Sequence, residues 1–264
     1  MKIINEIKGS VEEEYLTEIV SNISKNLKYD FVFNTWGNKI KSEIKNKTII
    51  FIISDETHSM PTAEYFKPNI EMIFKNYHPI KEKHPKLRPL PLGYINGFCG
   101  ENKFKISKRK IDYSFAGAWN HKRKYLKNAF EERKNDGMQK YFFIIKNWCG
   151  KENVGLSIKE YSSLLSNSKI SLCPPGYSSN ESFRICESAK CGNIIVAEDP
   201  YDFWYNKNLP FFKVENWQNL KIIDQILSLG ENELQEFSEK TFQWYENNIS
   251  PKSVANYIEK QLKF

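Results

Sequence analysis

ISLCPPGYSSNESFRICESAKCGNIIVAE, residues 170–198, decides the fold of this chain. It opens with a short apolar stretch, and the Pro-Pro-Gly at 174–176 ends a strand and forces a loop. The Ser-Ser-Asn at 178–180 supplies favourable N-cap residues, so a helix is expected to begin between Ser178 and Ser182 and to end at Gly192. Residues 193–197 are apolar enough for a second buried strand. The stretch predicts a strand, loop, helix and strand with the two strands parallel.

The first turn of this helix has the chemistry of a phosphate-binding site. Unpaired amides and the helix dipole attract anions at such a terminus. Arg184 and Glu187 are three residues apart and share one face near it. The arginine can bind phosphate, and the glutamate can accept hydrogen bonds from ribose hydroxyls. The alternative is an ordinary β-α-β crossover in which the two residues form a surface ion pair of little energetic value.

This order of motifs is similar to the signature of exostosin-like glycosyltransferases. The resemblance is carried by Cys-Pro-x-Gly at 173–176, by Ser-Phe-Arg-x-x-Glu at 182–187, and by a helix end at Gly192 followed by a strand. In that family the segment lies in the C-terminal half of a GT-B fold and holds the nucleotide of a UDP-sugar, with the glutamate on the ribose. The chain departs from the family at Pro175, where an arginine is common.

Two weaker similarities to the family flank this stretch. Tyr-Ser-Phe-Ala-Gly at 113–117, followed by Arg123, resembles the strand, glycine turn and arginine-bearing helix that open the family's nucleotide domain. Leu-Pro-Phe at 209–211, followed by Trp217, resembles a later motif. The resemblance covers roughly the last 150 residues, a normal size for one domain. The part of the chain before it carries no motif that we can match.

Carried over residue by residue, the resemblance implies a set of donor-binding residues. They are Gly117, Arg123, Pro174, Gly176, Tyr177, Ser182, Phe183, Arg184 and Glu187. The two arginines and the helix terminus would stabilise the negative charge of the departing diphosphate, a role in which they can replace a metal ion. We therefore expect neither a metal ion nor a cofactor.

Strands alternate with helices along the chain, which predicts an α/β fold with parallel sheets. We expect a GT-B-like architecture of two doubly wound Rossmann-like halves with a cleft between them. Residues 1–108 would form the acceptor-side domain, and residues 109–264 the nucleotide-sugar-binding domain. The linker is placed at 93–110, where lysines are frequent. These lysines and Arg109 would form either a basic lip over the cleft or a solvated linker, and the second interpretation is favoured.

The periodicity of apolar residues locates the elements. Strands are expected at 29–33, 48–53, 70–74, 111–116, 140–145, 169–172 and 193–197. Helices are expected at 11–27, 217–229, 231–247 and 253–262, besides those between the strands of the second half.

The general base is expected in the first half, so that closure of the two halves assembles the site around both substrates. Asp55 is the first acidic residue after the predicted strand at 48–53, and we choose it over its neighbours Glu56 and His58. It would take the proton of the acceptor hydroxyl. An acidic pair at a strand end is also a common turn or N-cap arrangement.

Composition limits the class of protein. The 264 residues include 39 basic and 32 acidic ones, and the net charge of +7 permits anionic partners without demanding nucleic acid. The sequence contains neither a P-loop nor a Gly-x-Gly-x-x-Gly fingerprint, the usual signals of ATP hydrolysis and NAD chemistry. It has no apolar run of membrane-spanning length and no apolar leader. We therefore expect a protein of the cytoplasm, or of the host-cell cytoplasm if it is viral.

The cysteines also argue against a disulfide framework. There are five of them, without C-x-x-C spacing, and reduced, mostly buried thiols are the favoured interpretation. A zinc site at Cys173, Cys186 and Cys191 is a minor alternative.

The sequence thus favours a glycosyltransferase that moves a sugar from a UDP-sugar to a glycan hydroxyl. Inversion at the anomeric carbon is what the resemblance implies, and no residue identifies the sugar. One alternative is the same chemistry on DNA, as in phage- or virus-type modifying enzymes, where basic residues would track phosphates. Another is a catalytically idle binding module with a nucleotide-sugar fold.

Overall fold

The computed structural model describes residues 2–35, 39–40, 43–58, 62–79, 81, 83–145 and 155–262. The chain divides into two compact units. The first unit comprises Met1–Asn96, Phe203–Tyr205 and Asn248–Phe264, and the second comprises Gly97–Asp202 and Asn206–Asn247.

The first unit is built on a five-stranded parallel sheet whose strands lie side by side in chain order. They are β1 (Ile3–Asn5), β2 (Asp30–Thr35), β3 (Thr48–Ile53), β4 (Ile70–Lys75) and β5 (Leu87–Pro89). The central strand, β3, has the sequence TIIFII and all of its residues are buried. A run that is apolar on both faces is what a parallel strand covered on both sides requires.

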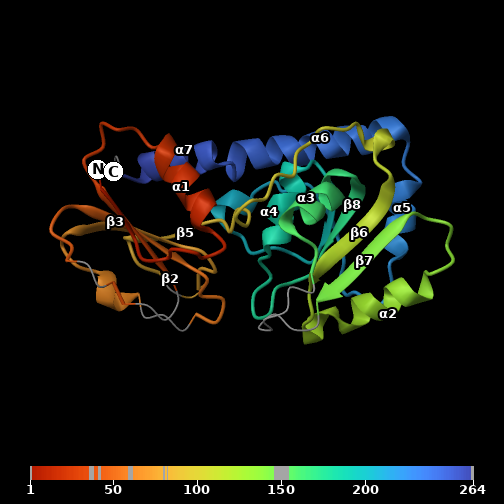
Figure 1. Cartoon of the computed structure of the whole chain (residues 1–264), viewed down its shortest axis with the longest axis horizontal. Coiled ribbons are helices and arrows are strands. Elements are labelled where there is room, and N and C mark those ends of the chain that lie inside the picture. Colours follow the sequence, from red (N-terminus) through yellow and green to blue (C-terminus); the bar gives the residue numbers. More distant parts are fainter. Residues whose placement is uncertain are drawn as a thin grey trace. The chain divides into compact units, whose positions relative to one another are not determined.

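Two helices far apart in the sequence pack together in the first unit, α1 (Glu13–Asn22) and α7 (Pro251–Leu262) (Figure 1). The Tyr15 hydroxyl donates a hydrogen bond of 2.6 Å to the Ile249 carbonyl. The ring of Tyr257 meets Phe74 of β4 edge to face, with the ring centroids 6.4 Å apart. The last helix thus belongs to the first unit, which differs from the expected division at residue 108, because its apolar face is buried there.

The second unit contains a second five-stranded parallel sheet, with the strand order β10-β9-β8-β6-β7. Its strands are β6 (Ile111–Ala118), β7 (Lys140–Ile145), β8 (Ser168–Cys173), β9 (Ile194–Ala197) and β10 (Phe211–Lys213). Its helices are α2 (Lys124–Glu132), α3 (Ile158–Ser166), α4 (Phe183–Lys190), α5 (Lys221–Leu227) and α6 (Glu231–Asn248). Figure 1 shows these elements from yellow-green to blue.

Successive side chains of β8 point to opposite faces of the sheet and pack against different helices, because side chains alternate along a strand. Ile170 and Leu172 belong to the apolar core that also contains residues of α2 and α5. Ser171 points to the other face, where its hydroxyl accepts a hydrogen bond of 2.7 Å from Ser188 of α4. The sheet is therefore covered on both faces, and its strands are correspondingly apolar.

The structure confirms the predicted α/β fold of two parallel sheets and the strands expected in both halves. Strands β1, β5 and β10 were missed, because three residues are too few to show a periodic pattern. The predicted doubly wound order is found in the second sheet, whereas the described strands of the first follow the chain order. In the described part of the chain, no helix has the length and apolar character needed to span a membrane.

Candidate functional site

The strand order of the second sheet reverses at β6. The chain leaves β6 for β7 on one side and returns to β8 on the other, so that β6 and β8 are neighbours. In open α/β sheets, ligands bind at the carboxyl ends of the strands at such a reversal. Here those ends are Ala118 of β6 and Cys173 of β8. Every predicted donor-binding residue lies at this edge or just beyond it, in the two following loops or in α4.

Hydrogen bonds join the loop after β6 to the loop after β8. The Asn120 side-chain amide donates to the Gly176 carbonyl at 3.2 Å, and the Arg123 guanidinium donates to the Pro175 carbonyl at 2.9 Å. Asn120 also caps the turn that follows it, because its side-chain oxygen accepts from the Arg123 amide at 3.2 Å. The structure thus brings together Arg123 and Gly176, two of the predicted residues, and adds Asn120, which sequence reasoning missed although it is a good cap residue.

Arg184 is buried at the start of α4 and holds the end of β6. Its Nε donates to the Ala116 carbonyl at 3.1 Å, and its guanidinium carbon lies 4.7 Å from the centroid of the Phe115 ring. A Cβ at Gly117 would stand 2.2 Å from Nη2 of this guanidinium, so the glycine permits the close approach. Burial of both Arg184 and Glu187 excludes the surface ion pair that the sequence left open.

Helix α4 begins with a capped terminus that faces the same edge. Ser182 is the N-cap residue, and its hydroxyl accepts from the Arg184 amide at 3.4 Å. Ser182 and Phe183 are both half-buried, so they are accessible in part. The remaining first-turn amides and the helix dipole give this end of the helix a partial positive charge.

Glu187 lies deeper in the second unit, between α4 and α3. Its carboxylate accepts a hydrogen bond of 2.7 Å from the hydroxyl of Tyr161, a residue that sequence reasoning missed. Burial, with the charge of Glu187, raises the pKa of Tyr161 well above its ordinary value. A ribose hydroxyl at Glu187 would therefore share the carboxylate with the hydroxyl of Tyr161.

Exposed aromatic side chains lie at this edge. Tyr177 follows Gly176 directly and is 63% exposed, and Trp119 follows Ala118 at the end of β6 and is also exposed. The ring of His121, from the first loop, stands perpendicular to that of Tyr177 at 6.0 Å between centroids. These rings offer flat surfaces that suit a nucleobase or a sugar.

The structure corrects the choice of Asp55 as the general base. Its carboxylate forms an ion pair of 2.8 Å with the ammonium of Lys75, at the end of the neighbouring strand β4, and both side chains are 0% exposed. A base that takes the proton directly must contact the acceptor hydroxyl, and the Asp55 carboxylate has no exposed surface for such a contact. Glu56 is half-buried, and His58 is exposed with a backbone φ of 56°. These two residues stay predictions.

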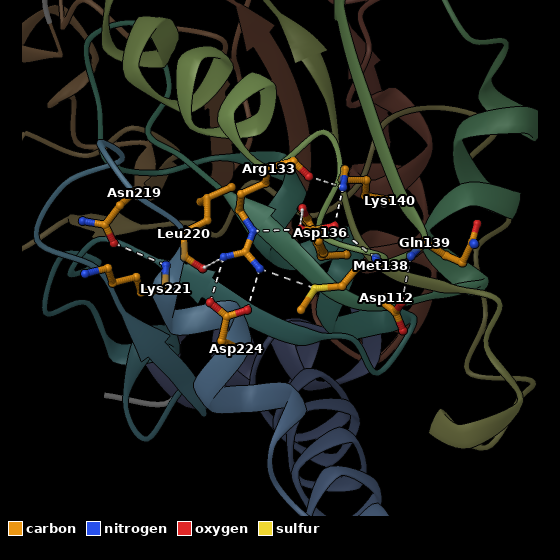
Figure 2. Close-up of polar contacts among 11 residues, drawn as sticks. Asp112, Arg133, Asp136, Met138, Gln139, Lys140, Asn219, Leu220, Lys221 and Asp224 are labelled. Carbon is orange, nitrogen blue, oxygen red and sulfur yellow. Dashed lines mark hydrogen bonds and ion pairs between the residues drawn. The ribbon is translucent and has the colours of Figure 1, made fainter.

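The opposite, amino-terminal edge of the second sheet carries a network of ion pairs (Figure 2). Arg133, after α2, contacts both carboxylate oxygens of Asp224 in α5, at 2.8 and 2.5 Å, and donates from Nε to Asp136 at 2.9 Å. Lys140, at the start of β7, contacts Asp136 at 2.5 Å. The network ties α2, β7 and α5 together at the edge away from the predicted donor site, so its role is structural.

Arg109 lies at the same amino-terminal edge, just before β6. Its guanidinium is buried and donates to the carbonyls of Ser168 and Cys191 at 2.9 and 2.7 Å. Burial lowers the pKa of Arg109 to about 10. Arg109 therefore belongs to the core rather than to a basic lip, whereas the linker lysines 103, 105, 108 and 110 are exposed.

Three of the five cysteines have the burial expected of packing residues, whereas Cys99 is exposed. Cys173, Cys186 and Cys191 are buried, and burial raises the pKa of Cys191 to about 12. Within the described ranges, no three His, Cys, Asp or Glu side chains are grouped so that they could hold a metal ion. Cys149 lies outside the described residues.

Comparison with solved structures shows that the chain shares the fold of GT-B glycosyltransferases. A glycosyltransferase from Rickettsia africae ESF-5 aligns with a TM-score of 0.58 and 11% identity over 99% of this chain and 97% of that one. Anabaena Alr3699/HepE, in complex with UDP, aligns with a TM-score of 0.50 and 8% identity over 100% of both chains. The GtfA/B complex aligns with a TM-score of 0.50 and 10% identity over 96% of this chain, which spans only 60% of that one.

The comparison with curated proteins found no match. The family model of the RXYLT1 C-terminal domain matches residues 101–258, which include every predicted donor-binding residue and the whole second sheet. The match is to this glycosyltransferase-related family, and the exostosin-like resemblance stays a prediction. The chain belongs to the RXYLT1 C-terminal domain family.

Proposed function

We propose that the protein transfers a sugar from a UDP-sugar to a hydroxyl of a glycan, with inversion and without a metal ion. The family match and the GT-B fold support a glycosyltransferase. The structure of HepE with UDP supports a uridine nucleotide as the leaving group.

The observation that carries the proposal is the composition of the edge where β6 meets β8. Two loops joined by Asn120 and Arg123 lie beside the capped terminus of α4. A diphosphate there would accept from the first-turn amides and the Ser182 hydroxyl. The buried guanidinium groups of Arg123 and Arg184 would supply positive potential behind these donors, where charge develops on the departing diphosphate.

Roles for the remaining predicted residues follow from their positions. Tyr177, exposed at the loop tip, would stack on the uracil or the sugar. Glu187 would accept from a ribose hydroxyl while it keeps its bond to Tyr161. Gly117, Pro174 and Gly176 would shape the loops rather than bind through side chains. The base would be supplied by the first unit.

Calorimetric titration with UDP and with uridine tests the donor site. Tyr177→Ala should weaken the binding of both ligands, because both contain the base. Tyr125→Ala is the matched control, since Tyr125 is also a solvent-exposed tyrosine, 51% exposed, but lies on α2. Unchanged affinity in Tyr177→Ala would remove Tyr177 from the site, and absence of UDP binding by the wild-type protein would overturn the donor assignment.

Turnover distinguishes the alternative functions. Release of UDP from one member of a panel of UDP-sugars, faster with a glycan acceptor, is the result expected of a glycosyltransferase. Binding of UDP without any release would indicate an idle binding module. Transfer to DNA, with an affinity that falls steeply as salt is raised, would indicate a DNA-modifying enzyme.

A further inference from the structure

A second carboxylate lies at the carboxyl edge of the first sheet and has no role in the function proposed above. Glu12, at the start of α1, is 1% exposed. Both of its carboxylate oxygens lie 2.9 Å from the hydroxyl of Ser54, the first residue after β3. The hydroxyl of Ser10 donates to one of them at 3.2 Å.

The surroundings of Glu12 differ from those of Asp55. Lys75 neutralises Asp55, whereas the partners of Glu12 among the described residues are the hydroxyls of Ser10 and Ser54 and the side chain of Asn76. Burial raises the pKa of Glu12 above its ordinary value, and hydrogen bonds from these three residues offset only part of the effect. A buried carboxylate without a cation binds a proton more readily than a paired one.

Ser54 forms a hydrogen bond with the buried Glu12 carboxylate and is itself partly accessible to solvent. Ser54 is half-buried rather than buried, and its backbone has a φ of 60°, a conformation that non-glycine residues seldom adopt. Its amide donates to the side-chain oxygen of Asn76, the first residue after β4, at 3.0 Å. The hydroxyl is thus held in place from two strands, donates to Glu12, and keeps lone pairs that can accept from another hydroxyl.

We propose that Ser54 contacts the acceptor hydroxyl and that Glu12 accepts its proton through Ser54. The inference rests on the proposed glycosyl transfer. The acceptor proton moves to the Ser54 oxygen as the Ser54 proton moves to the Glu12 carboxylate. The acceptor oxygen bonds to the anomeric carbon, and the bond from that carbon to the phosphate oxygen breaks with its electron pair, which leaves on UDP. Ser54 is the catalytic hydroxyl, and Glu12 is the residue that acts through it.

The test compares turnover, UDP affinity and the pH profile of kcat for Glu12→Gln, Ser54→Gly and the control Glu14→Gln, an exposed neighbour on the same helix. Glu12→Gln keeps a hydrogen-bond acceptor for Ser54 but loses the proton affinity. It should lower kcat by about 10²–10⁴, the range for loss of a general base, while UDP affinity stays unchanged. The fall of kcat at acidic pH that is expected of the wild-type protein should be absent from Glu12→Gln.

Ser54→Gly keeps the inference testable if Glu12→Gln does not fold, because glycine adopts a φ of 60° without strain. It should lower kcat comparably, and the measurement is made on protein that still shows a cooperative unfolding transition. Normal turnover in either folded variant would overturn the relay and leave the proposed function intact. A wild-type protein that neither binds UDP nor releases it from any UDP-sugar would overturn the proposed function and the relay together.

Discussion

The guanidinium of Arg184 occupies the space that a side chain on Gly117 would need. The distance from a Cβ at residue 117 to Nη2 of Arg184 would be 2.2 Å, closer than any ordinary contact. Arg184 is fixed there by the Ala116 carbonyl and the Phe115 ring, so it has little room to move. Two parts of the predicted donor site, Gly117 near the end of β6 and Arg184 of α4, are therefore one structural unit.

Gly117→Ala should displace Arg184 and weaken both stability and UDP binding. Packing an extra methyl group into such a site costs about 1–3 kcal/mol of unfolding free energy. Gly230→Ala is the control, since a Cβ there would meet its nearest neighbour at an ordinary 3.4 Å. Denaturant unfolding and UDP titration measure the two effects. A Gly117→Ala protein as stable as Gly230→Ala would contradict the close packing described here.

Asp55→Asn should destabilise the fold, because it leaves the ammonium of Lys75 buried without its counter-charge. Removal of one partner of a buried pair costs about 3–5 kcal/mol, whereas replacement of both by apolar residues is often neutral. The double variant Asp55→Leu/Lys75→Met should therefore be more stable than Asp55→Asn. Urea unfolding measures all three proteins, with Glu56→Gln as the control. If Asp55→Asn unfolds like the wild-type protein, the pair does not form as described.

The ion-pair network of Figure 2 should make stability depend on pH. Partial burial alone would raise the pKa of Asp136, but hydrogen bonds from Lys140, the Met138 amide and Arg133 outweigh burial and lower it from 3.8 to about 2. A carboxylate with a lowered pKa stabilises the folded state above its unfolded pKa. That stabilisation is lost as the pH falls from about 4 through about 2.

Asp136→Asn should therefore be less stable than the wild-type protein near neutral pH, by about 2 kcal/mol, and the difference should shrink toward about pH 2. Thermal or urea unfolding across this pH range checks the trend. Asp202→Asn, at an exposed position, is the control. A difference between Asp136→Asn and wild type that does not change with pH would contradict the assignment of the lowered pKa to the network.

Turnover should survive a chelator. The proposed diphosphate site has a helix terminus backed by Arg123 and Arg184, which can stabilise the leaving group as a metal ion would. The measurement is UDP release from a UDP-sugar with and without EDTA. Loss of activity in EDTA that manganese or magnesium restores would show that a metal ion takes part after all.

Local sequence determined the strand, loop and helix between β8 and β9. The proline loop ends β8 after Cys173, Ser182 caps α4, and Gly192 follows the helix with a φ of 63°. Each signal acts within a few residues through backbone sterics or a single hydrogen bond, so it can be read without knowledge of the rest of the chain.

Tertiary structure decided what the charged residues do. Asp55 follows a strand in the sequence, yet its burial depends on Lys75, which a neighbouring strand brings beside it. Arg123 and Arg184 were predicted to face a ligand, and their hydrogen-bond partners include carbonyl oxygens of residues distant in the chain. A side chain's charge is visible in the sequence, but its partner is set by which strands become neighbours.

The sequence alone was enough to predict parallel α/β sheets and the strand, loop and helix of the candidate site, because apolar runs and turn residues are local properties. It did not determine that β8 returns to the side of β6, or that α7 packs on α1 in the first unit. Burial of apolar faces drives both arrangements, and that force is non-directional, so no single residue specifies the partner. The joined loops of the candidate site exist only because the folded sheet places β6 beside β8.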